Sequence, residues 1–207
     1  GAEMIITDHE QGSLEWFESR LGIPSASSYS KLVTSTGKKA STFDDYCYQL
    51  ACERITGERT DTFKTPAMER GNELEEEART AYEFIYEKTV TETGFILDQS
   101  KLFGCSPDGL IMVDNGYEHG LEIKCPMAKT HLKYLDKGKL PTEYKAQVHG
   151  CMLVTGLEYW DFISYHPQIE MFFIRVERDE EFIKILRNYL LEASERIAQL
   201  TTIGEKK

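Results

Sequence analysis

Two carboxylates and a lysine interrupt an apolar stretch in the middle of the chain. Asp108 stands in CSPDGL, and Glu122 and Lys124 stand in LEIKCP. On a strand, Glu122 and Lys124 share one face because successive side chains alternate. Two carboxylates held close repel each other, and a divalent cation such as Mg²⁺ relieves that repulsion through oxygen ligands. Such a site can hydrolyse a phosphate ester, with Lys124 positioning the water or neutralising the phosphoryl oxygens.

The segment between these residues predicts a hairpin, and the length of its loop decides the geometry. An Asn-Gly loop of two residues would set Asp108 opposite Ile123 and point it away from Glu122. A loop of three residues, Asp114 to Gly116, with the glycine in a left-handed bulge, would set Asp108 opposite Glu122. Because only the second register brings the carboxylates together, we predict the three-residue turn.

The order Pro-Asp, an interval, then Glu-x-Lys is the PD-(D/E)xK nuclease pattern. A Glu and a Lys two residues apart are also common as an exposed cross-strand ion pair. Three features favour the nuclease site: the Pro before Asp108, the apolar residues that flank both motifs, and the hairpin that joins them.

Helical and strand patterns predict the frame that must hold these residues. Helices are expected at the start of the chain and again later, and strands fill the middle and return near the end. The expected helices cover short stretches within residues 12–33, then 42–56, 67–88, 142–154 and 179–200, and the expected strands cover 89–97, 102–105, 109–113, 120–125, 159–165 and 170–177. This order predicts an α/β fold in which a mixed sheet is sandwiched by helices.

Composition places the chain among globular proteins of one domain, 1–207, with residues 1–3 expected to be an expression remnant or disordered. Of 207 residues, 41% are hydrophobic and 29% charged, and the net charge of -11 argues against a generally basic nucleic-acid binder. The five cysteines form no CxxC pair, so zinc and iron-sulfur sites are not expected. The five histidines, His119 among them, show no zinc spacing. Without a signal-peptide pattern or a long apolar run, we expect a cytoplasmic protein.

An ordered series of motifs resembles bacteriophage lambda exonuclease and its phage and prophage relatives, the lambda-type alkaline exonucleases. The series is WFESRLGIPSAS, RGNELEEEAR, CSPDGL, LEIKCP, YKAQVHGCMLVTG and VERDEEF, and it spans nearly the whole chain. The resemblance implies a restriction-endonuclease-like core. It also implies a Mg²⁺-dependent enzyme that digests one strand of double-stranded DNA from the 5′ end, releases mononucleotides and leaves a 3′ overhang for recombination.

By motif match, the resemblance also assigns the metal ligands. Asp108, Glu122 and the backbone carbonyl of Ile123 would hold Mg²⁺, with Mn²⁺ as a substitute, and Lys124 would assist the water. Glu75 matches an additional acidic residue that would help to hold a second ion. The alternative is that Glu75 only belongs to a solvent-exposed helix face, because its neighbours in GNELEEEAR are equally acidic.

Four residues match positions that grip the terminal 5′-phosphate in the family: Arg20, Ser27, Ser106 and Gln147. An arginine with two hydroxyls and an amide suits an anion pocket. The same residues have structural explanations: Arg20 as a cation at a helix end, Ser27 and Ser106 as a cap and a turn residue, and Gln147 as an exposed amide. Met68 could act as a wedge against the opened terminal base pair or pack in the core. Trp16 could support Arg20 or anchor its helix, and Tyr144 could share the face of Gln147 or pack in the core.

The resemblance implies a ring-shaped homotrimer, a single-strand annealing protein as partner, and a phage or prophage protein acting in a bacterial host. Lysines are candidates for the DNA-facing lining and equally plausible as solubilising residues: Lys31, Lys38, Lys39, Lys129, Lys133, Lys137 and Lys139. Two other functions stay open. One is a related nuclease of different polarity or with endonucleolytic activity, and the other is a non-catalytic DNA-end-binding module.

Overall fold

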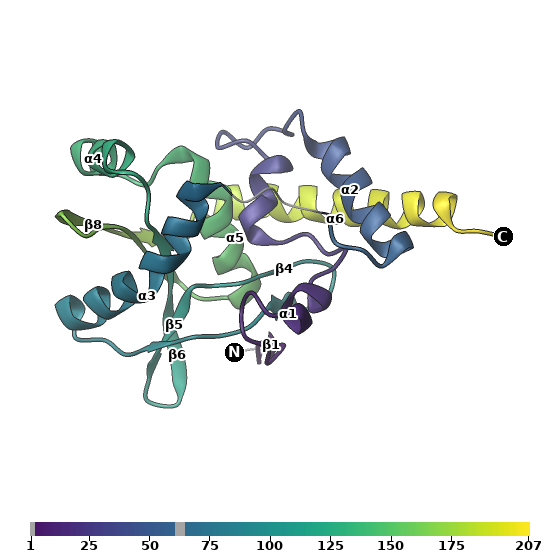
Figure 1. Ribbon diagram of the computed structural model, residues 1–207. Helices are drawn as coiled ribbons and strands as arrows, with labels where there is room; N and C mark the ends of the chain where they lie inside the picture. Colours follow the sequence, from purple (N-terminus) through teal and green to yellow (C-terminus); the bar gives the residue numbers. More distant parts are fainter. Residues whose placement is uncertain (1–2, 61–64) are drawn as a thin grey trace.

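A mixed sheet of five strands forms the centre of the computed structural model, which describes residues 3–60 and 65–207 (Figure 1). In spatial order the strands are β2 (Val90–Thr91), β5 (Gly109–Val113), β6 (Gly116–Lys124), β7 (Tyr159–His166) and β8 (Ile169–Glu177). Only β6 and β7 pair in parallel, and the other neighbours are antiparallel. A parallel pair needs a crossover, and helices between β6 and β7 provide it.

A second, three-stranded sheet contains β1 (Ile5–Ile6), β3 (Ile96–Leu97) and β4 (Gly104–Cys105). The single strand predicted over residues 89–97 is therefore wrong, because β2 and β3 belong to different sheets. The chain turns between them at Gly94, where a Cβ atom would lie 2.0 Å from the carbonyl oxygen of Thr7. Only a glycine allows the two backbones to approach this closely.

Helices cover one face of the large sheet and enclose the main core. These are α2 (Phe43–Thr56), α5 (Lys145–Thr155) and α6 (Glu180–Gly204), together with the 3₁₀ helix η1 (Ala26–Lys31). Figure 1 shows α6 as a long helix that runs beside α2. A short 3₁₀ helix, η2 (Thr142–Tyr144), precedes α5, and α1 (Leu14–Ser19) begins at its cap Ser13.

The opposite face of the sheet is covered by α3 (Pro66–Tyr86). This helix begins where the sequence predicts, since Pro66 occupies its first turn and the hydroxyl of Thr65 accepts the backbone N–H of Met68 at 3.2 Å. Its buried residues Ala78 and Tyr82 pack against Leu121 and Ile123 of β6. Helices on both faces of a mixed sheet confirm the predicted sandwich.

One helix, α4 (Ala128–Lys137), was not predicted. It contacts β7 and β8, and it ends at Gly138 with a left-handed φ of 65°. Its buried side chains are a histidine and a tyrosine rather than aliphatic residues: His131 contacts Ser164 Oγ at 2.7 Å, and Tyr134 packs near Phe162. A polar inner face hides the apolar periodicity on which a sequence-based helix prediction depends.

No helix among the described residues is long and apolar enough to cross a membrane. Residues 1–3 are expected to be an expression remnant or disordered, and residues 1 and 2 lie outside the described part of the chain. All five cysteines, Cys47, Cys52, Cys105, Cys125 and Cys151, are free thiols.

Candidate active site

Asp108 and Glu122 meet at the end of the β5–β6 ladder. Gly109 lies opposite Leu121 and Leu110 lies opposite Gly120, so extending the ladder by one residue sets Asp108 opposite Glu122. The Asp108 carboxylate is tied to β6 directly, because its Oδ2 accepts the backbone N–H of Ile123 at 2.7 Å. The register that the sequence needed is therefore present.

The turn that produces this register differs from the prediction. Val113 pairs with Gly116, so the loop has only two residues, and Asp114 rather than Gly116 adopts a left-handed φ, of 56°. This loop alone would misalign the two carboxylates. The ladder shifts between Ile111 and Met112, and Glu118 is the extra residue on β6. This bulge restores the alignment, so the predicted three-residue turn is wrong although the predicted pairing is right.

Glu122 and Lys124 point to the face of the sheet that α5 covers, where Gln147 meets both. Lys124 Nζ lies 3.1 Å from Glu122 Oε1 and donates to Gln147 Oε1 at 3.2 Å. Gln147 Nε2 donates to Glu122 Oε1 at 3.0 Å. The glutamate side chain is only 4% exposed. These three polar groups thus fix one another through two hydrogen bonds and an ion pair.

The ammonium of Lys124 stays protonated in this arrangement. Burial opposes its charge, but the carboxylates of Glu122 and Asp108 outweigh burial and raise the pKa of Lys124 above its ordinary value. The ring of Tyr144 lies 4.6 Å from Nζ and gives further cation–π stabilisation. Tyr144 also packs against the core at Phe162, so both interpretations of this residue apply.

Asp108 and Glu75 have unusually high pKa values. Burial raises the pKa of Asp108 to about 8, and the nearby Glu122 carboxylate adds to the rise. Burial, followed by the charge of Asp108, raises the pKa of Glu75 to about 8. Glu75 therefore lies beside Asp108 and is not simply part of a solvated helix face. Carboxylates that repel one another in this way favour a divalent cation.

The donor set fits a hard divalent metal ion. Glu122 Oε2 is buried and has no hydrogen-bond partner, and an orphan oxygen of this kind is available as a ligand. Across residues 3–60 and 65–207, no three His, Cys, Asp or Glu side chains converge closely enough to form a cage by themselves. Asp108, Glu122 and a backbone carbonyl would supply a partial shell, and Mg²⁺ commonly completes such a shell with water.

The cleft above these residues has a volume of about 460 Å³. Its lining joins α3 to the end of β6: Met68, Gly71, Asn72, Glu75, Asp108, Glu122, Ile123, Lys124, Cys125, Pro126 and Tyr144. Met68 is 57% exposed at its rim, so this methionine does not pack in the core.

Two of the four candidate phosphate-binding residues, Arg20 and Ser106, are linked through Trp16. The Arg20 guanidinium stacks 4.3 Å from the ring centroid of Trp16, whose Nε1 donates to Ser106 Oγ at 3.2 Å. Trp16 is buried, so it both anchors α1 and supports Arg20. Ser27 is exposed on η1, and Gln147 contacts Glu122 and Lys124.

The Arg20 side chain has the character of an anion site. Among the described residues, no carboxylate forms an ion pair with it. Burial lowers the pKa of Arg20 from its ordinary 12.5, and a guanidinium remains charged after such a shift. A half-buried guanidinium with no carboxylate paired to it in the described part of the chain attracts a phosphate.

Comparisons with known proteins agree with this geometry. Residues 15–158 match the family model described as the YqaJ-like viral recombinase domain. The chain belongs to this family. A search of curated protein sequences gives no match.

Solved structures extend the comparison beyond the matched segment. The alkaline exonuclease LHK-Exo from Laribacter hongkongensis is 34% identical to this family member, with a TM-score of 0.78, and the match covers 92% of this chain and 97% of that chain. LHK-Exo in complex with dAMP matches with 34% identity and a TM-score of 0.81, over 92% and 96% of the two chains. A phage-related exonuclease from Haemophilus somnus shares the fold at 18% identity, with a TM-score of 0.68, over 87% and 96%.

Sequence reasoning about this viral recombinase domain missed Arg79. Its guanidinium donates to Glu75 Oε1 at 3.0 Å and to the backbone oxygen of Asp108 at 3.3 Å. The signal was its place one helical turn after Glu75, the usual spacing of a helical ion pair. What the chain alone does not reveal is the contact with Asp108, which comes from another element.

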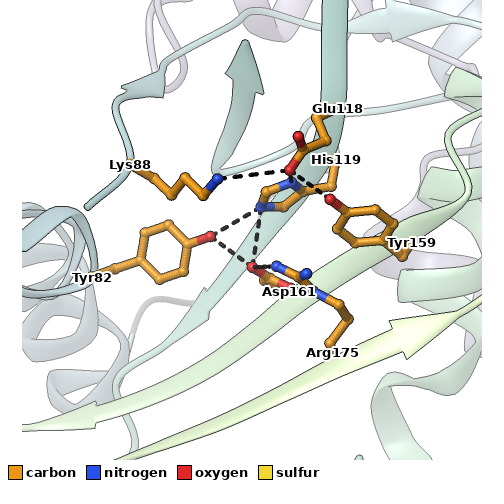
Figure 2. Close-up of polar contacts among 7 residues, drawn as sticks. All are labelled: Tyr82, Lys88, Glu118, His119, Tyr159, Asp161 and Arg175. Atoms are coloured by element: carbon orange, nitrogen blue, oxygen red, sulfur yellow. Dashed lines mark hydrogen bonds and ion pairs between the residues drawn. The ribbon is translucent and has the colours of Figure 1, made fainter. Parts of the chain in front are cut away.

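A buried polar network lies on the α3 face of the sheet, away from the Glu122 face (Figure 2). At its centre Asp161 of β7 accepts from Tyr82 at 2.6 Å and from two Arg175 nitrogens at 2.8 and 3.0 Å, and His119 Nε2 lies 3.1 Å from its Oδ2. These donors hold the pKa of Asp161 at about 2, although burial acts in the opposite direction. His119 is fully buried here, which agrees with a structural role.

The seven lysines proposed for a DNA-facing lining are all exposed: Lys31, Lys38, Lys39, Lys129, Lys133, Lys137 and Lys139. Lys39 pairs with Glu192 at 2.7 Å. Lys129, Lys133 and Lys137 lie on α4, and Lys139 follows its cap. Exposure makes these side chains available to a polyanion without distinguishing a DNA-facing lining from a solubilising surface.

Proposed function

We propose that this protein is a Mg²⁺-dependent exonuclease that digests one strand of double-stranded DNA in the 5′ to 3′ direction. It would start at 5′-phosphorylated ends, release 5′-mononucleotides and leave 3′ single-stranded overhangs for homologous recombination. The observation that carries the proposal is the buried Glu122 with an orphan oxygen, set opposite Asp108 and paired with Lys124. The structure of LHK-Exo with dAMP supports a mononucleotide product.

Asp108, Glu122 and the backbone carbonyl of Ile123 would hold one metal ion, and Glu75 with Asp108 would help to hold a second. Bound there, Mg²⁺ or Mn²⁺ would lower the pKa of a water molecule and neutralise charge on the phosphate. The protonated Lys124 cannot accept a proton, so its role is to orient the water and to stabilise the phosphoryl oxygens by donating hydrogen bonds. Gln147 accepts a hydrogen bond from Lys124 and donates one to Glu122, and so holds the two side chains in place.

Recognition of the 5′ end would fall to Arg20, with Ser106 and Ser27 as hydroxyl donors and Gln147 nearer the reacting phosphate. Trp16 makes the Arg20 side chain rigid by stacking, which reduces the entropy lost when a phosphate binds. Met68 stands exposed at the cleft rim and is placed to contact the terminal base pair as an apolar wedge.

The proposal extends to assembly and location. A homotrimeric ring would thread DNA past the exposed lysines while the acidic exterior, within a net charge of -11, stays in solvent. A single-strand annealing protein is the expected partner at the 3′ overhang. The site of action would be the cytoplasm of a bacterial host that carries the phage or prophage.

End-labelled linear duplexes with either a 5′-phosphate or a 5′-hydroxyl, incubated with and without Mg²⁺, test the proposal. We expect Mg²⁺-dependent release of mononucleotides, faster from the phosphorylated end. Asp108→Asn should abolish release, and Arg20→Met should remove the preference for phosphate by roughly the 1.5–3 kcal/mol typical of a charged hydrogen bond. Arg187→Met, which removes an arginine outside the cleft, is the matched control.

Two results would contradict this function. Nicking of closed circular DNA would indicate an endonuclease, and DNA-end binding without cleavage would indicate a non-catalytic module. If the protein digests phosphorylated and hydroxyl 5′ ends equally well, the proposed role of Asp108 stands and the proposed role of Arg20 is wrong.

A further inference from the structure

Arg79 connects three elements behind the candidate metal site. From α3 its Nη2 donates to Glu75 Oε1 at 3.0 Å and to the backbone oxygen of Asp108 at 3.3 Å, and its Nη1 lies 3.3 Å from Glu92 Oε1. Its side chain is only 13% exposed, whereas that of Glu92 is 73% exposed. The Glu92 pair is therefore a weak rim contact, and the contacts to Glu75 and Asp108 are the sheltered ones.

Two ion pairs flank Asp108 in this arrangement. On the α5 side of the sheet, Lys124 pairs with Glu122 at 3.1 Å. On the α3 side, Arg79 pairs with Glu75 at 3.0 Å. Asp108 itself is held from both directions, because Ile123 donates to its carboxylate and Arg79 to its backbone.

The charge balance explains why a cation is needed at this position. Glu75, Asp108 and Glu122 all line the cleft, and Lys124 pairs with Glu122 on the side that faces Gln147. Glu75 is 30% exposed, and the Arg79 guanidinium is the cation that ties its carboxylate to the side of Asp108. The planar guanidinium can bridge a carboxylate and a carbonyl at once, which an ammonium on a flexible stem does less well.

Resting on the proposed function, we propose that Arg79 is a positioning residue of the metal site: it holds the Glu75 carboxylate and the Asp108 backbone in the arrangement that binds a second divalent ion. Arg79 does not line the 460 Å³ cleft in which Lys124 and Glu122 lie, but with Glu75 and Asp108 it lines an adjoining cavity of about 810 Å³. Its role is assigned to Glu75 and Asp108 because it donates hydrogen bonds to both.

A general role in attaching α3 to the sheet is already filled by another residue. One helical turn after Arg79, Tyr82 is fully buried and donates to Asp161 at 2.6 Å, within the network of Figure 2. Tyr82→Phe should loosen this attachment without touching Glu75. It therefore separates stability of the helix from placement of the carboxylate.

Mn²⁺ titration of the full chain by calorimetry, without DNA, tests the inference. We expect Arg79→Met to weaken Mn²⁺ affinity about 10-fold, the lower end of the effect of removing a partner that orients a metal ligand. Arg79→Lys should recover part of the loss. In a Glu75→Gln background, Arg79→Met should have little further effect, because the ligand it orients is gone.

Tyr82→Phe is the control, and it should lower the melting temperature while leaving Mn²⁺ affinity unchanged. If Arg79→Met does not fold, Arg79→Lys carries the comparison, and equal affinity of Arg79→Lys and the wild type would overturn the inference. Additive effects of Arg79→Met and Glu75→Gln, or a loss of affinity in Tyr82→Phe as large as that in Arg79→Met, would also overturn it.

Failure of the proposed function gives a different pattern. A wild-type chain that binds no Mn²⁺ and cleaves no DNA overturns both proposals. A wild-type chain that binds Mn²⁺ and releases mononucleotides, alongside an Arg79→Met variant with unchanged affinity, overturns only the role of Arg79.

Discussion

Metal affinity should rise steeply between pH 6 and pH 8, because the ligands must lose protons before they bind the ion. The pKa values of Asp108 and Glu75 are both about 8. At pH 6 a carboxyl with that pKa is ionised in only about one molecule in a hundred, and at pH 8 in about half. If binding requires Asp108 alone to be ionised, affinity increases about 50-fold, or about 2 kcal/mol, over this range. A second proton from Glu75 makes the dependence steeper.

Calorimetric titration with Mn²⁺ at pH 6 and pH 8, in buffers of different ionisation enthalpy, measures both the affinity and the protons released. We expect about one proton or more to leave for each site filled at pH 6. Glu75→Gln should reduce the proton count. Glu73→Gln, an exposed position on the same helix, should leave both quantities unchanged. Equal affinity at the two pH values with no proton release would refute the reasoning.

The same high pKa values have a consequence for the metal-free protein. A carboxyl whose pKa is higher in the folded chain than in the unfolded chain stabilises the fold while it is protonated. That contribution is fully present below the ordinary pKa of 3.8 for Asp108 and is lost as pH rises through about 8. Thermal melting without metal should therefore show stability falling from pH 6 to pH 8, and saturating Mg²⁺ should oppose the fall. A metal-free melting temperature that rises over this range would contradict the assignment.

Three further substitutions have defined outcomes. Lys124→Met should lower the turnover rate on phosphorylated duplexes about 100-fold or more at saturating Mg²⁺, and Lys124→Arg should be less impaired. Full activity of Lys124→Met would exclude Lys124 from the site. Asp161→Asn should cost about 2 kcal/mol of unfolding free energy at pH 7, since the wild-type contribution is present above pH 3.8 and is lost as pH falls through about 2. Denaturant unfolding of both chains at pH 7 and pH 2 tests this, and an equal difference in unfolding free energy at the two pH values would contradict it. Gly120→Ala would place a Cβ atom 2.2 Å from the buried ring of Trp160, so we expect a loss of about 1–3 kcal/mol in the same assay.

The placement of the candidate residues Asp108, Glu122 and Lys124 could be predicted because its signals are local. Strand alternation sets Glu122 and Lys124 on one face whatever surrounds them, and the structure places them there. Asp108 needed the hairpin register as well. That register was predicted correctly through the wrong turn, since the compensating bulge at Glu118 has no glycine or other sequence mark.

Contacts that join distant segments could not be predicted from the sequence. The Arg79 pairing with Glu75 follows helical spacing, but its contact with the Asp108 backbone depends on how α3 docks on the sheet. The same holds for Asp161, whose donors come from α3, β6 and β8. Gln147 shows the same limit of sequence-based prediction. A glutamine in a helix sequence can be exposed or can bond Glu122, and the sequence does not distinguish the two.

The site lies across the end of the sheet rather than on one face of it. Glu122 and Lys124 project toward α5, and Glu75 reaches in from α3 on the opposite face. Asp108 is the residue that both sides share, through Ile123 of β6 and Arg79 of α3. A small displacement of α3 relative to the sheet would therefore move Glu75 away from Asp108 while leaving the Lys124–Glu122 pair intact. The second metal position should be the more easily lost of the two, and the first should survive substitutions confined to α3.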